Sequence, residues 1–315
     1  MTANHEGEEL IWAYLLHLGY NMWCDREVPG TKKEYWTATP YLRCDIGFWH
    51  ELIDKMAAAG INMVVIDLGE GVRYETHPEL AVRDSWTGDR LREELARIRG
   101  KQVEPIPKLN FSACHDTWLG ECARSLSTET YYTVCRDIIA EVIELFDGPR
   151  LFHLGMDEET AQHQRDYAYV VVRQHELWWH DLNFYVEQVE KGGARPWIWS
   201  DYMWRHPELF FRIMPKSVLQ CNWYYGEEFK DEIKQVRSYL ELEKHGYDQM
   251  PTGSNWSHPG NFEKTVAYCT PRIPRQRLKG FLQTSWKPTL EACRERHIAA
   301  IEQVARARAG TELLT

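Results

Sequence analysis

The sequence lacks any apolar run close to the roughly 20 residues that a membrane-spanning helix needs. Its first ten residues, MTANHEGEEL, are polar and acidic, whereas a signal peptide would begin basic and continue apolar. Basic residues are also outnumbered, 37 Lys and Arg against 47 Asp and Glu, and the formal net charge of −10 repels a phosphate backbone. We therefore expect a cytoplasmic protein that binds neither a membrane nor a nucleic acid.

Paired cysteines and phosphate-binding glycine motifs are missing as well. The eight cysteines include no C-x-x-C, so neither a zinc knuckle nor a redox motif is predicted, and reduced structural thiols are the simpler interpretation. No G-x-G-x-x-G or G-x-x-x-x-G-K-[ST] follows an apolar run. These absences predict a protein without a cofactor.

Aromatic residues, by contrast, are abundant. The chain has 14 Trp and 16 Tyr among 315 residues, although its mean hydropathy of −0.54 shows that it is not generally apolar. Tryptophan faces pack against the C–H faces of sugar rings, while the indole N–H can serve a hydroxyl. Part of this aromatic set belongs to the core, but the composition makes a carbohydrate the first candidate ligand.

Strand patterns and helix patterns alternate eight times along the chain. The predicted strands are residues 11–20, 61–68, 102–109, 150–155, 196–200, 218–223, 247–254 and 279–285. Helical patterns follow at 46–59, 88–99, 128–146, a long stretch that ends at Gly192-Gly193, 207–213, 227–245, a helix that begins near 261, and 289–309. This order predicts one (β/α)8 TIM barrel over residues 1–315, with a doubly wound open sheet as the alternative.

Polar and aromatic residues gather after the predicted strands, where a (β/α)8 barrel carries its active site. The candidate substrate-binding residues are Asp67, His115, His153, Trp199, Asp201, Trp223, Tyr225 and Trp286. His153 is equally compatible with a hydrogen-bonded core position. Trp178-Trp179, within the fourth helical stretch, is typical of internal packing or of an interface, so a homo-oligomer remains an alternative.

The segment 151–160, LFHLGMDEET, is the most informative. Asp157 and Glu158 follow an apolar strand and a Gly155 turn. Adjacent side chains on a strand point to opposite faces, so both acids reach one pocket only if the strand has ended by Asp157. Two carboxylates held close together have different pKa values, so that one stays protonated near neutral pH while the other is ionised. Cleavage of a glycosidic bond requires this division of roles. The alternative is a helix N-cap followed by a first-turn acid.

A metal centre is another use of the same strand ends. His115, Asp116, His153 and the two acids are residue types that barrel hydrolases use as ligands. No H-x-H or H-x-x-x-H spacing occurs there, so we expect no metal. His115 and Asp116 are then either a pocket pair or a loop cap.

Residues 129–159, ETYYTVCRDIIAEVIELFDGPRLFHLGMDEE, resemble the strand-4 region of glycoside hydrolase family 20, the β-N-acetylhexosaminidases, whose signature there is His-x-Gly-Gly-Asp-Glu. The resemblance extends over about residues 43–290. Segments 53–56 and 60–62 are similar to the family's entry into its second strand, and similar pocket residues are His115, Trp199 with Asp201, and Trp286. The resemblance implies an enzyme that removes terminal β-linked N-acetylhexosamine.

The same resemblance implies a retaining, substrate-assisted mechanism. Glu158 would protonate the glycosidic oxygen and later activate water. Asp157 would orient the 2-acetamido group, whose carbonyl oxygen attacks C1. Barrel glycosidases with two catalytic carboxylates commonly place the second one at the end of the seventh strand. Segment 247–260, which contains the predicted seventh strand, offers only Asp248, and Asp248 lies at the wrong end of that strand. The residues therefore agree with a nucleophile that the substrate supplies.

Several departures from the family pattern concern recognition of the sugar. Met156 replaces the second glycine of the signature, and Lys108 stands where the family has an acidic residue. Lys287 follows Trp286 in place of the glutamate that binds the outer hydroxyls. The family's arginine that binds the ring hydroxyls has no firm match here; Arg43 is a candidate, and Arg73 is a poorer one. The alternative function is a non-catalytic carbohydrate-binding barrel derived from such an enzyme.

Overall fold

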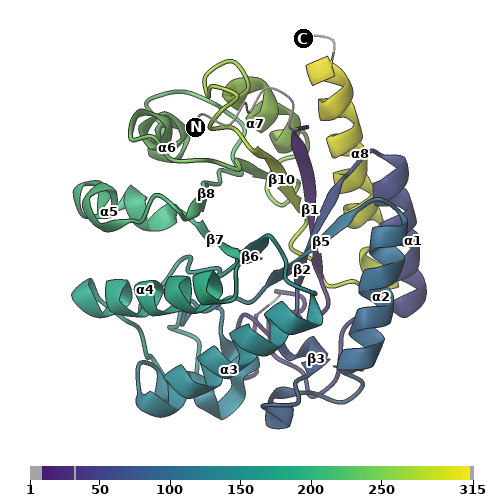
Figure 1. The fold of residues 1–315 in the computed structure, drawn as a ribbon, viewed down its shortest axis with the longest axis vertical. Coiled ribbons are helices and arrows are strands. Elements are labelled where there is room, and N and C mark those ends of the chain that lie inside the picture. Colours follow the sequence, from purple (N-terminus) through teal and green to yellow (C-terminus); the bar gives the residue numbers. More distant parts are fainter. Residues whose placement is uncertain (1–8, 32, 313–315) are drawn as a thin grey trace.

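The computed structural model describes residues 9–31 and 33–312, and these form a barrel of parallel strands surrounded by helices (Figure 1). The barrel strands are β1 (Ile11–His17), β2 (Met63–Asp67), β5 (Glu104–Lys108), β6 (Leu151–His153), β7 (Arg195–Trp199), β8 (Leu219–Cys221), β9 (Thr252–Ser254) and β10 (Gly280–Thr284). They pair in the order β8-β7-β6-β5-β2-β1-β10-β9. Isolated parallel bridges, Gln220–Gln249 and Trp223–Thr252, join the two ends of this sheet. The predicted (β/α)8 barrel is confirmed.

Within the described residues, one α-helix follows each barrel strand. The helices are α1 (Ile46–Ala58), α2 (Gly88–Gly100), α3 (Glu129–Leu145), α4 (His175–Lys191), α5 (Pro207–Ile213), α6 (Lys234–Lys244), α7 (Asn261–Cys269) and α8 (Arg294–Glu312). Two short strands that were not predicted, β3 (Val72–Arg73) and β4 (Trp86–Thr87), pair in the segment between β2 and α2. Trp178 and Trp179 of α4 are buried against Tyr202, so they pack within the chain.

The helix α3 shows why these segments are helical. Val134, Ile138 and Val142 are buried along one face, as the four-residue spacing predicts. At its start, the hydroxyl of Thr128 accepts a hydrogen bond from the N–H of Tyr131, which satisfies one otherwise free donor of the first turn. No helix in the described part of the chain is both long and apolar enough to cross a bilayer.

The core has two layers because successive side chains of each strand point to opposite faces. On β1, Trp12, Tyr14 and Leu16 belong to the layer between strands and helices. Ala13 and Leu15 belong to the layer inside the barrel. The fully buried strands therefore appear in the sequence as continuous apolar runs rather than as an alternating pattern.

The fourth helix begins later than the sequence predicts. The stretch before Gly192-Gly193 is helical only from His175, and residues 154–174 form an irregular loop. The fully buried guanidinium of Arg173 lies 2.6 Å from Glu159 and 3.2 Å from Asp181. The loop wraps around this guanidinium, which a continuous helix would not allow. Similarly, α6 starts at residue 234 rather than near 227.

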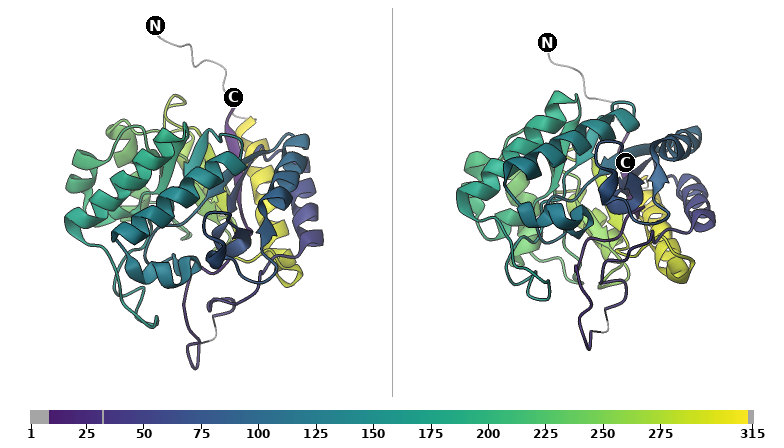
Figure 2. Two further views of the ribbon diagram at one scale, coloured as in Figure 1. Left: turned by 60° about the horizontal axis from the view of Figure 1, so that its bottom comes forward. Right: turned by 90° about the horizontal axis from the view of Figure 1, so that it is seen from below.

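Two long loops extend from the same end of the barrel (Figure 2). Residues 18–45 connect β1 to α1, and residues 154–174 connect β6 to α4. The two loops contact each other: Arg26 Nε donates a hydrogen bond to the carbonyl of Asp166 at 2.9 Å, and the N–H of Ala168 donates to Asp25 Oδ1 at 2.8 Å. Together they form one side of the candidate site.

Candidate functional site

The two predicted acids lie on a sharp turn that follows β6. Gly155, Met156 and Glu158 have positive φ angles of 71°, 75° and 55°, so the alternation of the strand has ended before Asp157. At residue 155 glycine is required for a second reason, since a Cβ there would overlap the side-chain amide of Asn110. This backbone meets the condition for both acids to reach one pocket.

Asn110, just after β5, fixes the turn. Its Nδ2 donates a hydrogen bond to Asp157 Oδ1 at 2.9 Å, and its Oδ1 accepts one from the N–H of Met156 at 3.2 Å. The helix-cap interpretation of the acids is wrong, because α4 starts at His175 with Gln174 as its N-cap. The acids are thus held by side-chain contacts from a neighbouring strand.

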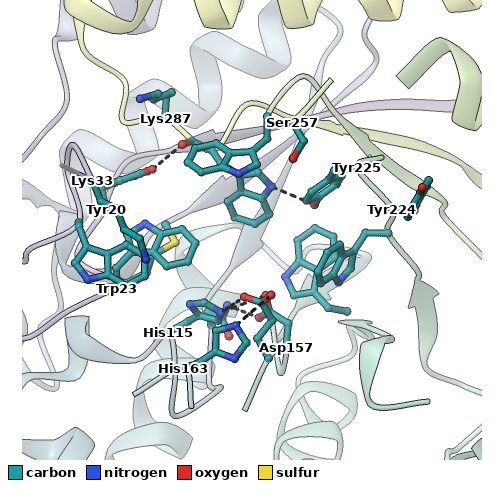
Figure 3. Close-up of a pocket in the computed structure, with 18 of the residues that line it drawn as sticks. Tyr20, Trp23, Lys33, His115, Asp157, His163, Tyr224, Tyr225, Ser257 and Lys287 are labelled. Atoms are coloured by element: carbon teal, nitrogen blue, oxygen red, sulfur yellow. Dashed lines mark hydrogen bonds and ion pairs between the residues drawn. The ribbon is translucent and has the colours of Figure 1, made fainter. Parts of the chain in front are cut away.

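Two histidines contact the acids. His115 Nε2 lies 3.4 Å from Asp157 Oδ2 and 3.4 Å from Glu158 Oε2, and His163 Nε2 lies 3.5 Å from Glu158 Oε1 (Figure 3). Burial disfavours a charged His115, but the carboxylates of Asp157 and Glu158 outweigh it and raise the pKa of His115 to about 9. At neutral pH His115 is therefore protonated on both ring nitrogens, and positively charged, in the resting site.

The ionisation of Glu158 follows from the same contacts. Burial acts to raise the pKa of Glu158, but hydrogen bonds and charge from His115 and His163 hold that pKa well below its usual range. Glu158 is therefore ionised in the resting site. A reaction that needs it as an acid must first move a proton onto it.

A third carboxylate, Asp201, supports the turn from behind. Its Oδ2 accepts a hydrogen bond from the N–H of Glu158 at 2.9 Å. Burial, and after it the charge of Asp157, raise the pKa of Asp201 to about 8, so Asp201 is a neutral acid at neutral pH. Asp201 was predicted to bind substrate, but the structure places it behind Glu158 rather than on the cavity wall.

Asp157 and Glu158 line a cavity of about 860 Å³. This volume lies within the range of small-molecule sites and exceeds the needs of one sugar ring. Its aromatic walls come from the loops after β1, β7, β8, β9 and β10. The aromatic residues are Tyr20, Trp23, Trp36, Trp199, Trp204, Trp223, Tyr224, Tyr225, Trp256 and Trp286.

The structure brings most of the predicted site residues to this cavity. Those that line it are His115, Asp157, Glu158, Trp199, Trp223, Tyr225 and Trp286. The Nε1 of Trp286 donates a hydrogen bond to the hydroxyl of Tyr225 at 3.1 Å, which fixes the two rings (Figure 3). The cavity thus presents acids on one side and an aromatic surface on the other.

Asp67 lies inside the barrel and does not line the cavity. Its Oδ2 is 2.5 Å from Lys108 Nζ and 3.4 Å from His17 Nδ1. Burial acts to raise the pKa of Asp67, but Lys108 and His17 outweigh it and lower that pKa to about 2. The lysine that departs from the family pattern is therefore half of an internal ion pair.

His153 is also internal. Its ring lies between Trp197 and Trp199, 4.8 and 4.5 Å away between centroids, and its Nδ1 accepts a hydrogen bond from the N–H of Gly155. Burial, and then the charge of Lys108, hold the pKa of His153 well below its usual range. His153 thus supports the acid-bearing turn as a neutral ring.

Arg43 does not line the cavity and instead holds the loop after β1. Its guanidinium donates to the carbonyl oxygens of Tyr20 at 2.8 Å and Tyr35 at 3.0 Å. Lys287 does line the cavity, and its Nζ lies 3.4 Å from Glu34 Oε2. The rim therefore carries an ion pair where the family pattern has a single glutamate.

Several residues that line the cavity are not among the candidates that the sequence predicts, including Trp23, Trp36, His163 and Asn110. Trp23 and Trp36 stack at 5.2 Å between centroids, and Trp23 also meets the edge of His115 at 4.9 Å. His163 comes from the loop before α4, and Asn110 from the end of β5. Three of the four lie in loops without periodicity, where a local pattern predicts no position.

The group His115, Asp157 and Glu158 also has the geometry of a cation site. Each residue offers one ligand atom, and in the described part of the chain these atoms lie within 4.8 Å of one another. The histidine follows β5 and the acids follow β6. Ligand spacing along the sequence therefore could not reveal the group.

No protein-family model matches the sequence, and no curated protein matches it. Solved structures do match. A β-N-acetylhexosaminidase from Bacteroides fragilis superposes with a TM-score of 0.63 and 12% identity, over 93% of this chain and 65% of its own. A family GH20 exo-β-N-acetylglucosaminidase from Vibrio harveyi gives 0.63 and 13%, over 96% and 57%. A Flavobacterium johnsoniae chitobiase gives 0.60 and 16%, over 83% and 46%.

The likeness is one of fold. At identities of 12 to 16%, these proteins share the barrel fold with this chain, but the likeness does not show that the chain has their activity. The chain spans 46 to 65% of the length of these three structures. The sugars named for those proteins therefore enter only as support for a proposal.

Proposed function

We propose that the protein is a glycoside hydrolase that removes terminal β-linked N-acetylhexosamine, GlcNAc or GalNAc, by a retaining, substrate-assisted mechanism. The observation that carries the proposal is the convergence of Asp157 and Glu158 on one aromatic-walled cavity. The shared fold with hexosaminidases supports it. A pair of acids with different ionisation is what cleavage of a glycosidic bond needs.

Asp157 acts on the acetamido group of the sugar. With Oδ1 held by Asn110 at 2.9 Å, its charge accepts the acetamido N–H and stabilises the positive charge that develops as the carbonyl oxygen attacks C1. The bond from C1 to the glycosidic oxygen breaks, and Glu158 donates its proton to that oxygen. Glu158 then takes a proton from water as the water opens the oxazolinium ring.

The proton for the first step is held on His115 in the resting site. His115 Nε2 is 3.4 Å from Glu158 Oε2, close enough for transfer after a small movement. A bound sugar excludes water, and the loss of solvent favours the neutral pair over the charged pair. The proton then moves from His115 to Glu158, which becomes the acid.

The cavity offers no second carboxylate in the position of an enzyme nucleophile. Among the described residues that line it, the remaining acid is Glu34, at the rim and paired with Lys287. Asp248 instead pairs with Arg195 and Arg277. This supports a nucleophile that comes from the substrate.

Aryl β-GlcNAc and β-GalNAc hydrolysis tests the proposal. Glu158→Gln should lower kcat by about 100- to 10,000-fold, the usual contribution of a general acid. Asp157→Asn should lower it by about 100- to 1,000-fold, because it removes a preorganised charge. A thiazoline mimic of the oxazoline should inhibit the hydrolysis.

Asp137→Asn, which changes a surface carboxylate on α3, is the matched control. Full rates in both site variants would refute the site assignment.

A non-catalytic sugar-binding barrel is the second candidate. The ionised resting state of Glu158 and the Lys287–Glu34 pair at the rim favour it, because neither is needed for hydrolysis. Binding of free N-acetyl sugars with no hydrolysis at any pH between about 4 and 8, the range over which a carboxylic acid or histidine titrates, would select this candidate.

A further inference from the structure

In the cluster of His115, Asp157 and Glu158, the imidazole lies too far from both acids for a short hydrogen bond. His115 Nε2 is buried, and its contacts with the acids are the two ion pairs of 3.4 Å, one to an oxygen of each acid, rather than well-aligned hydrogen bonds (Figure 3). A hydrogen bond from nitrogen to oxygen is about 2.7–3.2 Å long. The three groups therefore converge on one region of the cavity, and the imidazole forms no short hydrogen bond with either acid.

Two of the three separations match those of a tetrahedral metal site, and all three ligand atoms lie within 4.8 Å of one another. Zn²⁺ binds imidazole nitrogen and carboxylate oxygen at about 2.0–2.2 Å, so two of its ligand atoms lie about 3.3–3.6 Å apart. The two contacts of His115 Nε2, each 3.4 Å, fall inside this range. One histidine with two carboxylates is also a set that suits Zn²⁺ better than Mg²⁺ or Ca²⁺, which take oxygen ligands alone.

We propose that His115 Nε2, Asp157 Oδ2 and Glu158 Oε2 bind one Zn²⁺ ion, that His115 releases its Nε2 proton to solvent as the ion binds, and that the bound ion stops hydrolysis. Asn110 holds Asp157 from the second side, as the outer partner of a ligating carboxylate does. His163, 3.5 Å from the other oxygen of Glu158, stands beside the ion. The fourth position faces the cavity and is filled by water.

The bound ion would stop hydrolysis because it occupies the carboxylates of Asp157 and Glu158, which the reaction needs. This inhibition rests on the proposed function. An ion on Glu158 prevents that carboxylate from carrying a proton. An ion on Asp157 removes the charge that would hold the acetamido group. The ion and the sugar therefore exclude each other.

A surface group provides a matched control. His77 lies 3.0 Å from Glu79 and 3.4 Å from Asp137, so it too contacts two carboxylates. It does so through its two different ring nitrogens, Nδ1 and Nε2. These point away from each other and cannot bind one ion.

Calorimetric titration of the untagged chain with ZnCl₂, without sugar, tests the site. We expect one ion per chain. His115→Ala and Glu158→Gln should each weaken binding by about 100-fold or more, since loss of even an outer-shell partner costs about 10- to 100-fold. His77→Ala should bind as the parent does. No binding by the parent protein, or binding in both site variants as tight as in the parent, would overturn the proposal. If His115→Ala does not fold, the isosteric Glu158→Gln decides.

Inhibition is a separate measurement. In the active protein, Zn²⁺ should raise the apparent KM for an aryl hexosaminide and leave kcat at saturation unchanged, and a chelator should restore the rate. Inhibition that lowers kcat instead would refute mutual exclusion. A protein that binds Zn²⁺ but hydrolyses no glycoside would refute the proposed function and leave the metal site standing.

Discussion

His115 contacts both acids through one ring nitrogen, so its charge state affects the whole site. The carboxylates of Asp157 and Glu158 outweigh burial and raise its pKa from 6.5 to about 9. A group whose pKa is higher in the folded than in the unfolded chain stabilises the fold fully below the unfolded value. That stabilisation is lost as pH rises through the folded value.

The first prediction concerns stability against pH. Between about pH 6.5 and 9 the free energy of unfolding of the parent should fall, relative to His115→Gln, by up to about 1.4 kcal/mol per pH unit. Urea denaturation at several pH values measures this. Parallel curves for the two proteins would contradict the prediction.

The sequence identifies the acids but not what surrounds them. Asp157 and Glu158 stand out because a strand pattern ends just before them. His163 does not, because it reaches the acids through a folded loop, and Asn110 follows a predicted strand without any local sign that its side chain contacts the acids. Asp201 was assigned to substrate because it follows a strand, yet a local pattern cannot separate a residue that faces the cavity from one that supports it from behind.

The loop 154–174 is the element that departs most from its sequence pattern. The sequence predicts a long helical stretch after the fourth strand, but in this loop Arg173 contacts Glu159 and Asp181 in a fully buried network. Such a network is a contact between distant positions, and it overrides local helix propensity. The predictions for helices α2 and α3 are correct for the opposite reason, because apolar repeats dominate the buried faces of both helices.

The second prediction concerns this network. Arg173→Met leaves two carboxylates buried without their cation, and should lower the free energy of unfolding by about 3–5 kcal/mol. Denaturant titration measures it, with Arg165→Met as the control. Arg165 is 58% exposed beside Asp166, so its loss should cost less than about 1 kcal/mol. Equal costs for the two variants would show that the buried network does not hold the loop.

At the scale of the whole molecule, the two ends of the barrel differ in their charges. The acids and aromatic walls lie at the carboxyl ends of the strands. Asp248 lies just before β9, near the amino ends, with Arg195, Arg277 and Lys279 at 3.0, 3.1 and 3.5 Å. This division is typical of (β/α)8 barrels, in which one end serves chemistry and the other stability.

The third prediction tests that division. Asp248→Ala should lower the free energy of unfolding by about 1–3 kcal/mol, because three cations lose a common partner. It should leave kcat unchanged, since Asp248 does not line the cavity. Thermal unfolding and steady-state rates of the same preparation provide both values. A fall in kcat comparable to that of Asp157→Asn would contradict the separation.

The overall architecture was predictable because eight repeats of strand and helix leave few topologies. The path of residues 18–45 was not, because it has no periodicity and is held by Arg43 through backbone carbonyls. Trp23 and Trp36 belong to this segment. The sequence thus predicts the barrel and the acids, while one wall of the cavity emerges only in three dimensions.

The concentration of indole rings around the cavity has a practical consequence. Of the 14 tryptophans, those on its walls are Trp23, Trp36, Trp199, Trp204, Trp223, Trp256 and Trp286. Half of the tryptophans therefore lie beside any molecule that enters the cavity. Binding of a ligand in the cavity should therefore change the tryptophan fluorescence of the unlabelled protein, even in a variant that has no catalytic activity.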